Sequence, residues 1–178
     1  FPEGMTIDQW YYLCHLKNEK RGCLSAMATE FNLGYQAGTN PWSIPCDVAL
    51  PCATQNELHA EDAQELVRNG CFCVAEGANM PSTLPAIEVF REAGILYAPG
   101  KASNAGGVSV SGLEMSQNSL RLNWTEGEFD ERLHRIMQRI HHSCVEYGSK
   151  EGKVDYVDGA NIAGFVKVAD AMLAQGVI

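Results

Sequence analysis

The chain has 178 residues, of which 46% are hydrophobic and 20% charged. This length suits one ordinary domain with a real core, and the composition is typical of a globular protein. Thirteen lysine and arginine residues against 22 aspartate and glutamate residues give a net charge of −9, which argues against a nucleic-acid partner. No apolar run is long enough to cross a bilayer and FPEGMTIDQW has no signal-peptide pattern, so we expect a cytoplasmic protein without a membrane partner.

The seven cysteines are odd in number and scattered along the chain. Their spacing does not match the paired CxxC pattern of a zinc site, so no metal site is expected. Free cysteine behaves as a small hydrophobic residue, which predicts reduced and mostly buried thiols. The set comprises Cys14, Cys23, Cys46, Cys52, Cys71, Cys73 and Cys144.

Two short helices are predicted at the start of the chain. Residues 6–20, TIDQWYYLCHLKNEK, carry apolar side chains at helical spacing, and Thr6 is a suitable N-cap. Residues 24–32, LSAMATEFN, form a second helical stretch. Gly34, Gly38 and Pro41 then break the pattern, so a loop follows.

The middle of the chain alternates between strand and helix patterns. Strands are predicted at residues 46–52, 71–76 and 95–99, with helices at 59–70 and 81–94 between them. The first run, CDVALPC, is continuously apolar, which favours a strand buried on both faces. Right-handed crossovers make the three strands parallel neighbours whose carboxyl ends share one edge of the sheet.

From Asn104 onward the pattern is entirely helical. Asn104 is a candidate N-cap, and Thr125 with Glu128 forms a capping box that opens a long amphipathic helix. A loop of about ten residues and a final helix at 161–176 complete the chain. The predicted fold class is therefore α/β: the second half of a Rossmann-like nucleotide-binding domain, βαβαβ, at residues 1–104, followed by C-terminal helices at residues 105–178 that pack back toward a substrate domain.

Three loops rich in small and amide side chains follow the strands: LPCATQNE, AEGANMP and PGKASNAGGV. Ligands of open α/β sheets bind at the carboxyl edge, so these loops should face one crevice. Asn79 and the run Thr54, Gln55 and Asn56 supply hydrogen-bonding groups there. Ordinary turn and N-cap chemistry would account for the same residues.

The stretch GGVSVSG places three glycines in a helix, where each costs on the order of 1 kcal/mol relative to alanine. Glycine removes side chains that would keep a flat ring or a carboxylate away from the backbone. Val108 and Ser111 lie one turn apart on one face, so an apolar wall stands beside a hydroxyl donor. Tight packing of this helix on the sheet would explain the same residues.

Taken together, four motifs resemble the C-terminal part of hexameric glutamate dehydrogenases, especially the NADP-dependent bacterial and lower-eukaryote type. The motifs are PCATQNEL, AEGANMP, PGKASNAGGVSVSGLEMSQN and GANIAGFVKVADAMLAQG, with GTNPW ahead of the first strand. The resemblance implies reversible oxidative deamination of L-glutamate to 2-oxoglutarate and ammonium, with hydride transfer to a nicotinamide cofactor. NADP is favoured by overall resemblance and NAD stays open, because the residues that read the 2′ position precede this sequence.

The family also implies roles for individual residues. Ser111 of SGLEM would bind the side-chain carboxylate of glutamate, and Val108 would line the same pocket. Asn79 and Asn104 would contact the nicotinamide and its ribose. Positions along the cofactor would be taken by Cys52, Ala53 and Thr54.

The catalytic lysine, the catalytic aspartate and the GxGxxG loop of that family have no counterpart in this sequence. We therefore expect no catalytic residue here, an internal cut at Phe1, and no turnover by this polypeptide alone. A leucine, phenylalanine or valine dehydrogenase is an alternative, against which Ser111 argues because apolar substrates offer no distal carboxylate. The other alternative is a non-catalytic nucleotide-binding or assembly module.

Overall fold

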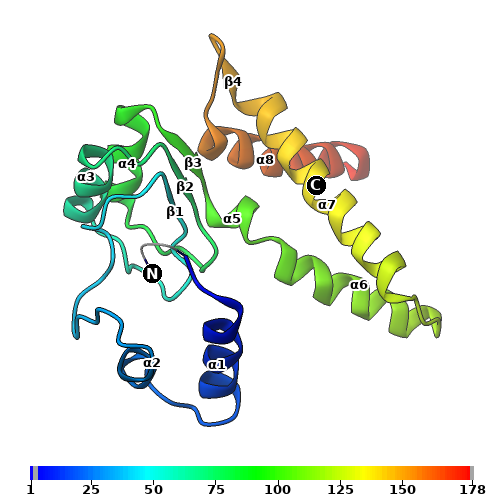
Figure 1. The fold of residues 1–178 in the computed structure, drawn as a ribbon. Coiled ribbons are helices and arrows are strands. Elements are labelled where there is room, and N and C mark those ends of the chain that lie inside the picture. Colours follow the sequence, from blue (N-terminus) through cyan, green and yellow to red (C-terminus); the bar gives the residue numbers. More distant parts are fainter. Residues whose placement is uncertain (2–3, 177–178) are drawn as a thin grey trace. The chain divides into compact units, whose positions relative to one another are not determined.

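The computed structural model describes residue 1 and residues 4–176. The chain forms two compact units, Phe1–Pro41 and Trp42–Ile178 (Figure 1). The predicted division between residues 104 and 105 stays a prediction. None of the described helices is long and apolar enough to cross a membrane.

The first unit contains α1 (Ile7–Asn18) and α2 (Leu24–Glu30), as the sequence predicts. Thr6 caps α1 through a capping box: the Gln9 backbone N–H donates to Thr6 Oγ1 at 3.3 Å, and the Thr6 N–H donates to Gln9 Oε1 at 2.8 Å. Leu16 and Met27 are buried. Between the two helical segments, the rings of Tyr12 and Phe31 meet edge to face with centroids 5.2 Å apart.

The second unit begins with a three-stranded parallel sheet in the order β1-β2-β3. The strands are β1 (Val48–Ala49), β2 (Cys73–Ala75) and β3 (Leu96–Ala98), joined by α3 (Ala60–Arg68) and α4 (Leu84–Ala93). The predicted βαβαβ unit is confirmed. Each strand is shorter than its apolar run, because ladder hydrogen bonds form only where neighbouring strands overlap.

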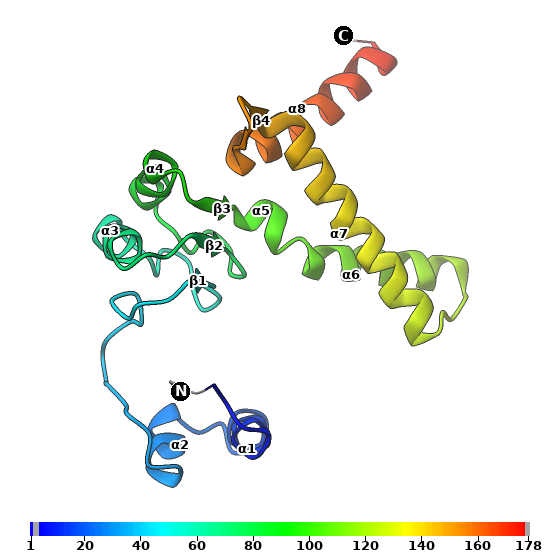
Figure 2. The same ribbon diagram turned by 45° about the horizontal axis from the view of Figure 1, so that its top comes forward.

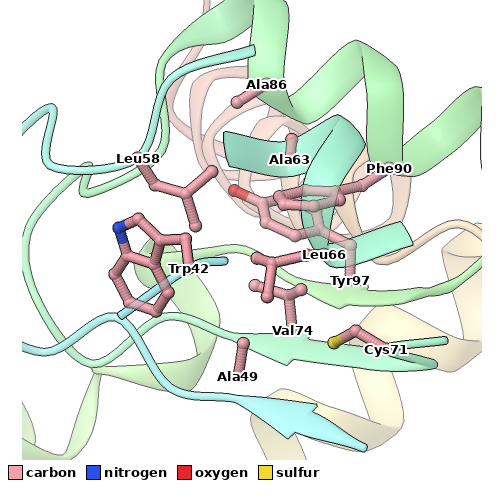
Figure 3. Packing of buried hydrophobic residues seen from close by; sticks show 10 residues of the cluster. All are labelled: Trp42, Ala49, Leu58, Ala63, Leu66, Cys71, Val74, Ala86, Phe90 and Tyr97. Carbon is pink, nitrogen blue, oxygen red and sulfur yellow. The ribbon is translucent and has the colours of Figure 1, made fainter. Parts of the chain in front are cut away.

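The hydrophobic core lies between the sheet and the pair α3 and α4 (Figure 3). Ala49 pairs with Val74 and Val74 with Tyr97, so one row across the sheet points to the same side. Leu66 of α3 and Phe90 of α4 are fully buried against this row. The Phe90 and Tyr97 rings stack with centroids 5.5 Å apart.

The prediction that the first strand is buried on both faces is wrong. Ala49 is buried, whereas Val48 is 45% and Leu50 60% exposed. Since the strand order advances in one direction, two right-handed crossovers place α3 and α4 on the same face of the sheet. The opposite face, which also carries Leu96, is left exposed.

After the sheet the chain continues as α5 (Gly100–Ser103), α6 (Gly106–Leu120), α7 (Glu126–Gly148) and α8 (Tyr156–Gln175) (Figure 2). The predicted capping box of α7 is confirmed: the Glu128 N–H donates to Thr125 Oγ1, and the Thr125 N–H donates to Glu128 Oε2. The hydrogen bond to Thr125 holds the pKa of the Glu128 carboxyl below its usual range.

Two predictions for the segment after α7 are wrong. It is not all helix and loop, because β4 (Ser149–Lys150) and β5 (Lys153–Val154) pair as an antiparallel hairpin. In addition, α8 begins at Tyr156 rather than at residue 161. Asp155 is its N-cap, with Oδ1 accepting the N–H groups of Val157 and Asp158 at 2.9 and 3.0 Å.

An ion-pair network joins the first turn of α8 to α4. Arg91 donates to Asp155 at 2.7 Å and to Asp158 at 3.3 Å, and Lys150 donates to Asp158 at 2.9 Å. Burial opposes ionisation of Asp155, but hydrogen bonds from the Asp158 N–H and from Arg91 outweigh it and lower its pKa. The network therefore stabilises the contact at neutral pH and loses this contribution as the pH falls through the lowered pKa of Asp155.

All seven cysteines are free, as predicted, but the expectation that most are buried is wrong. Cys71 and Cys144 are buried, Cys23 and Cys52 are exposed, and the other three are half-buried. Desolvation by burial raises the pKa of Cys144, so its thiol stays protonated at neutral pH.

The backbones of α7 and α8 approach closely where Gly148 and Gly159 lie. A Cβ added to Gly159 would stand 2.1 Å from the carbonyl oxygen of Cys144, and one added to Gly148 would stand 2.2 Å from that of Asp155. Neither position leaves room for a side chain, because the neighbouring atoms belong to the backbone. The crossing therefore requires glycine on both helices.

We predict that Gly159→Ala lowers the free energy of unfolding by about 1–3 kcal/mol, because the new methyl group forces α7 and α8 apart. Gly164→Ala on the same helix is the matched control, since nothing lies within 4 Å of its added Cβ. Urea unfolding of the intact protein should show a loss only for the first variant. Equal effects of the two substitutions would contradict this role of Gly159.

Candidate functional site

The three loops at the carboxyl ends of the strands come together, as the sequence predicts. The backbone N–H groups of Gly77 and Ala78, which follow β2, donate to the carbonyl oxygen of Pro51 after β1, at 2.9 and 3.1 Å. The Glu76 N–H donates to the Ala98 carbonyl of β3 at 3.1 Å. The loop after β2 is therefore held by both of its neighbours.

Asn79 and Asn104 meet at this edge although 25 residues separate them. Asn104 Nδ2 donates to the Ala78 carbonyl and to Asn79 Oδ1, both at 2.9 Å. The Asn79 Nδ2 and Asn104 Oδ1 atoms make no hydrogen bond to any described residue. The pair thus offers one donor and one acceptor to a ligand at the edge.

The prediction that Asn104 is an N-cap is wrong. The short helix α5 runs almost directly into α6, so Asn104 caps the C-terminus of α5, and Ala105, which is itself helical, precedes α6. The N–H groups of Ala105 and Gly107 donate to the carbonyls of Ala102 and Asn104, both at 3.4 Å. They are therefore not the free donors that an N-cap would leave.

Cys52, Ala53 and Thr54 are exposed on the loop after β1. The Ala53 and Thr54 N–H groups donate to Glu57 Oε1 at 2.8 and 3.3 Å, which fixes the turn. An added Cβ on Gly77 would lie 2.4 Å from Cys52 Sγ, so this loop packs tightly against the one after β2. The structure thus brings these three residues to the same edge as Asn79.

Ser111 and Val108 lie on α6, beyond the edge. Ser111 Oγ donates to the Gly107 carbonyl of its own helix at 3.4 Å, and Val108 is 74% exposed. The two residues share a face of α6, as predicted from their spacing. Both side chains are accessible to a ligand.

The glycines of α6 do not serve tight packing on the sheet. Nothing lies within 4 Å of a Cβ built on Gly107 or Gly112, and α6 packs mainly against α7. The explanation by tight packing is therefore wrong for Gly107 and Gly112, and close approach of a ligand stays a prediction. Gly100 of α5 differs, because its Cβ would lie 3.0 Å from the Ala78 carbonyl oxygen.

Glu76 is a buried carboxylate of this region whose role the sequence pattern does not indicate. Its side chain accepts the Ser82 N–H at 3.2 Å and the Gly100 N–H at 2.6 Å. The sequence shows Glu76 only as one of many carboxylates, with no second group at a meaningful spacing. Its burial depends on the chain returning through Ser82 and Gly100, which spacing along the sequence does not reveal.

These features define half of a Rossmann-like α/β fold. Helices cover one face of a parallel sheet, an amide pair lies at its carboxyl edge, and further helices continue from that edge. The described residues contain no cluster of three or more His, Cys, Asp or Glu side chains that could hold a metal ion. The chain belongs to the glutamate/leucine/phenylalanine/valine dehydrogenase family, whose profile matches residues 1–176.

Individual relatives are similar over nearly the whole chain. An NADP-specific glutamate dehydrogenase of Salmonella typhimurium is 58% identical over 98% of this chain, and an NAD-specific one of Bacteroides fragilis is 50% identical over 99%. A crystal structure of Plasmodium falciparum glutamate dehydrogenase matches 99% of this chain and 38% of its own, with 45% identity and a TM-score of 0.93. The chain spans 39–40% of the length of the two curated relatives.

We predict that Gly107→Ala leaves stability unchanged or raises it by up to about 1 kcal/mol, because alanine favours the helix and meets open space. Gly100→Ala is the contrasting variant and should destabilise the protein, since its Cβ would press on the Ala78 carbonyl. Thermal unfolding of the intact protein measures both. A marked loss in Gly107→Ala would indicate packing that the structure does not contain.

Proposed function

We propose that the polypeptide carrying this chain is an NADP-dependent glutamate dehydrogenase. The reaction converts L-glutamate, NADP⁺ and water to 2-oxoglutarate, ammonium, NADPH and a proton, reversibly. The observation that carries the proposal is the Asn79–Asn104 amide pair at the carboxyl edge, from which the chain leads directly into the helix of Ser111. The names of the similar relatives support the substrate.

The residues at the edge fit a nicotinamide group. Its carboxamide carries one acceptor and one N–H₂ donor, and the pair formed by Asn79 and Asn104 offers a free donor and a free acceptor. The cofactor supplies the hydride acceptor or donor when bound. Asn79 and Asn104 orient the nicotinamide and its ribose, and the exposed run Cys52, Ala53 and Thr54 lies along the cofactor.

Ser111 is proposed to bind the side-chain carboxylate of glutamate, with Val108 as the apolar wall of the same pocket. A hydroxyl donor pairs well with a carboxylate, and the exposed Val108 side chain accommodates the methylene groups. A leucine or phenylalanine substrate would leave the Ser111 hydroxyl without a partner. The position therefore favours a dicarboxylic substrate over the apolar amino acids of related dehydrogenases.

The cofactor preference is proposed as NADP, with NAD as the alternative, since relatives at 58% and 50% identity are named NADP-specific and NAD-specific. In a Rossmann domain, the residues that discriminate the 2′ position follow the second strand. The proposal also includes hexamer assembly and a cytoplasmic location. It places the catalytic lysine on another part of the polypeptide.

The first test is activity of the natural polypeptide that carries this chain. We expect NADPH oxidation that depends on both 2-oxoglutarate and ammonium, and little turnover with the oxo acids of leucine, phenylalanine or valine. A panel of these four oxo acids distinguishes the candidates. An inert protein that still binds NADPH would favour the non-catalytic module instead.

We predict that Ser111→Ala raises the KM for glutamate about 5- to 150-fold, equivalent to about 1–3 kcal/mol for a lost hydrogen bond to a charged group. Ser116→Ala is the matched control, because Ser116 Oγ makes the same bond to the carbonyl four residues earlier, at 2.8 Å. Steady-state kinetics with glutamate and NADP⁺ measure both variants. An unchanged KM in Ser111→Ala would refute this role.

A further inference from the structure

Glu76 lies buried between the two loops that carry Asn79 and Asn104. We propose that Glu76 is a positioning residue that holds these two loops in the geometry that receives the nicotinamide cofactor, an inference that rests on the proposed function. Glu76 itself does not reach the ligand, since its side chain is 4% exposed. It acts through the backbone of both loops.

Each oxygen of the Glu76 carboxylate binds a different loop. Oε1 accepts the Ser82 N–H at 3.2 Å, at the end of the loop that carries Asn79. Oε2 accepts the Gly100 N–H at 2.6 Å, at the start of the segment that leads to Asn104. One side chain therefore connects the two segments whose side chains form the amide pair.

The backbone of Glu76 reinforces this connection. Its carbonyl oxygen accepts a hydrogen bond from Ser103 Oγ at 2.6 Å, and its N–H donates to the Ala98 carbonyl at 3.1 Å. Ser103 directly precedes Asn104. Displacing Glu76 therefore changes the position of Asn104 as well as that of the loop after β2.

The packing around Gly100 leaves little space for any side chain. A Cβ on Gly100 would lie 3.0 Å from the Ala78 oxygen, 3.1 Å from Glu76 Oε2 and 3.4 Å from Asn104 Nδ2. These distances are at or below the usual limit for a methyl group. The turn is thus pressed against the same atoms that hold the amide pair.

The energetics of a buried carboxylate favour a functional reason for it. Glu76 makes no ion pair with any described residue, and the donors to its side chain are two backbone N–H groups. Burial of a charge without a cation is costly, and apolar residues of similar volume often replace such groups without loss of stability. What an apolar residue cannot do is accept two N–H groups from two separate loops.

Two buried hydroxyl groups, those of Tyr97 and Ser82, lie near the Glu76 carboxylate. Tyr97 and Ser82 are 5% and 3% exposed, and neither hydroxyl makes a hydrogen bond of normal geometry among the described residues. Burial, followed by the proximity of Glu76, raises the pKa of Tyr97, which keeps its hydroxyl neutral. The groups that donate to the carboxylate are the backbone N–H groups of Ser82 and Gly100.

Glu76→Gln in the intact protein is the sharpest test, because it keeps the volume and removes one of the two acceptors. The amide N–H₂ must then face either the Ser82 or the Gly100 N–H, and the connection opens. In the cofactor-free protein we expect faster hydrogen–deuterium exchange at the Ser82 and Gly100 amides. We also expect the Kd for NADPH, measured by fluorescence titration, to rise at least tenfold.

Glu92→Gln is the matched control, since Glu92 is exposed on α4 and the same change there should leave exchange and Kd unaltered. An unchanged NADPH Kd in Glu76→Gln, with only a lower melting temperature, would overturn the proposal and leave Glu76 a structural residue. If Glu76→Gln does not fold, Gly100→Ala separates the same loops without altering the charge. An unchanged Kd in that variant would equally overturn it.

The outcomes also separate this inference from the proposed function. A wild-type protein that binds no NADPH would refute the function, whereas the exchange rates of the cofactor-free protein would still report whether Glu76 connects the loops. If the wild-type protein is active and the Ser82 and Gly100 amides exchange at the same rate in Glu76→Gln as in the wild type, only the positioning role is refuted.

Discussion

The parallel pairing of β2 with both β1 and β3 is the constraint on which the site depends. Because β2 is central, the loop that follows it has a neighbour on either side, and the carbonyls of Pro51 and Ala98 fix its first residues. The same pairing aligns the buried row that packs against α3 and α4. Core formation and assembly of the loops are therefore consequences of one strand register.

Glycine serves two opposite purposes in the helices of this chain. At Gly148 and Gly159 it lets the backbones of α7 and α8 approach within a distance that excludes any side chain. At Gly107 and Gly112 it leaves the surface of α6 open. Both uses carry the same intrinsic cost to a helix. Only the three-dimensional neighbours of each glycine decide which purpose applies.

Much of the fold could be predicted from the sequence because its signals are local. Apolar runs of strand length, Gly94 at the end of α4, the N-cap at Thr6 and the capping box at Thr125 all act within a few residues of the chain. The predicted start of α8 at residue 161 is wrong because glycine is typical of loops, and Gly159 was therefore assigned to one. The crossing with α7 instead requires Gly159 within the helix. Burial on one face of the sheet likewise follows from the helix connections and not from the apolar run itself.

Only part of the candidate site could be predicted from the sequence, for a similar reason. The strand-end rule brings Asn79, Asn104 and the run from Cys52 to Thr54 to one edge, and the structure places them there. The N-cap assigned to Asn104 was wrong, since α5 intervenes and redirects its side chain to Asn79. Glu76 gave no signal, because its hydrogen-bond partners lie 6 and 24 residues away along the chain.

The cofactor side and the substrate side of the proposed site differ in how many contacts within this chain hold them in place. On the cofactor side, sheet pairing, a buried carboxylate and a glycine turn hold the loops with several hydrogen bonds. On the substrate side, Ser111 and Val108 project from a helix with no buried residue. Large apolar side chains on α6 and α8, such as Val108 and Phe165, are more than 70% exposed. Exposed apolar surface of this kind marks a face that other parts of a protein cover. The cofactor side of the proposed site is therefore fixed by contacts within the described residues, whereas α6 on the substrate side carries exposed apolar surface.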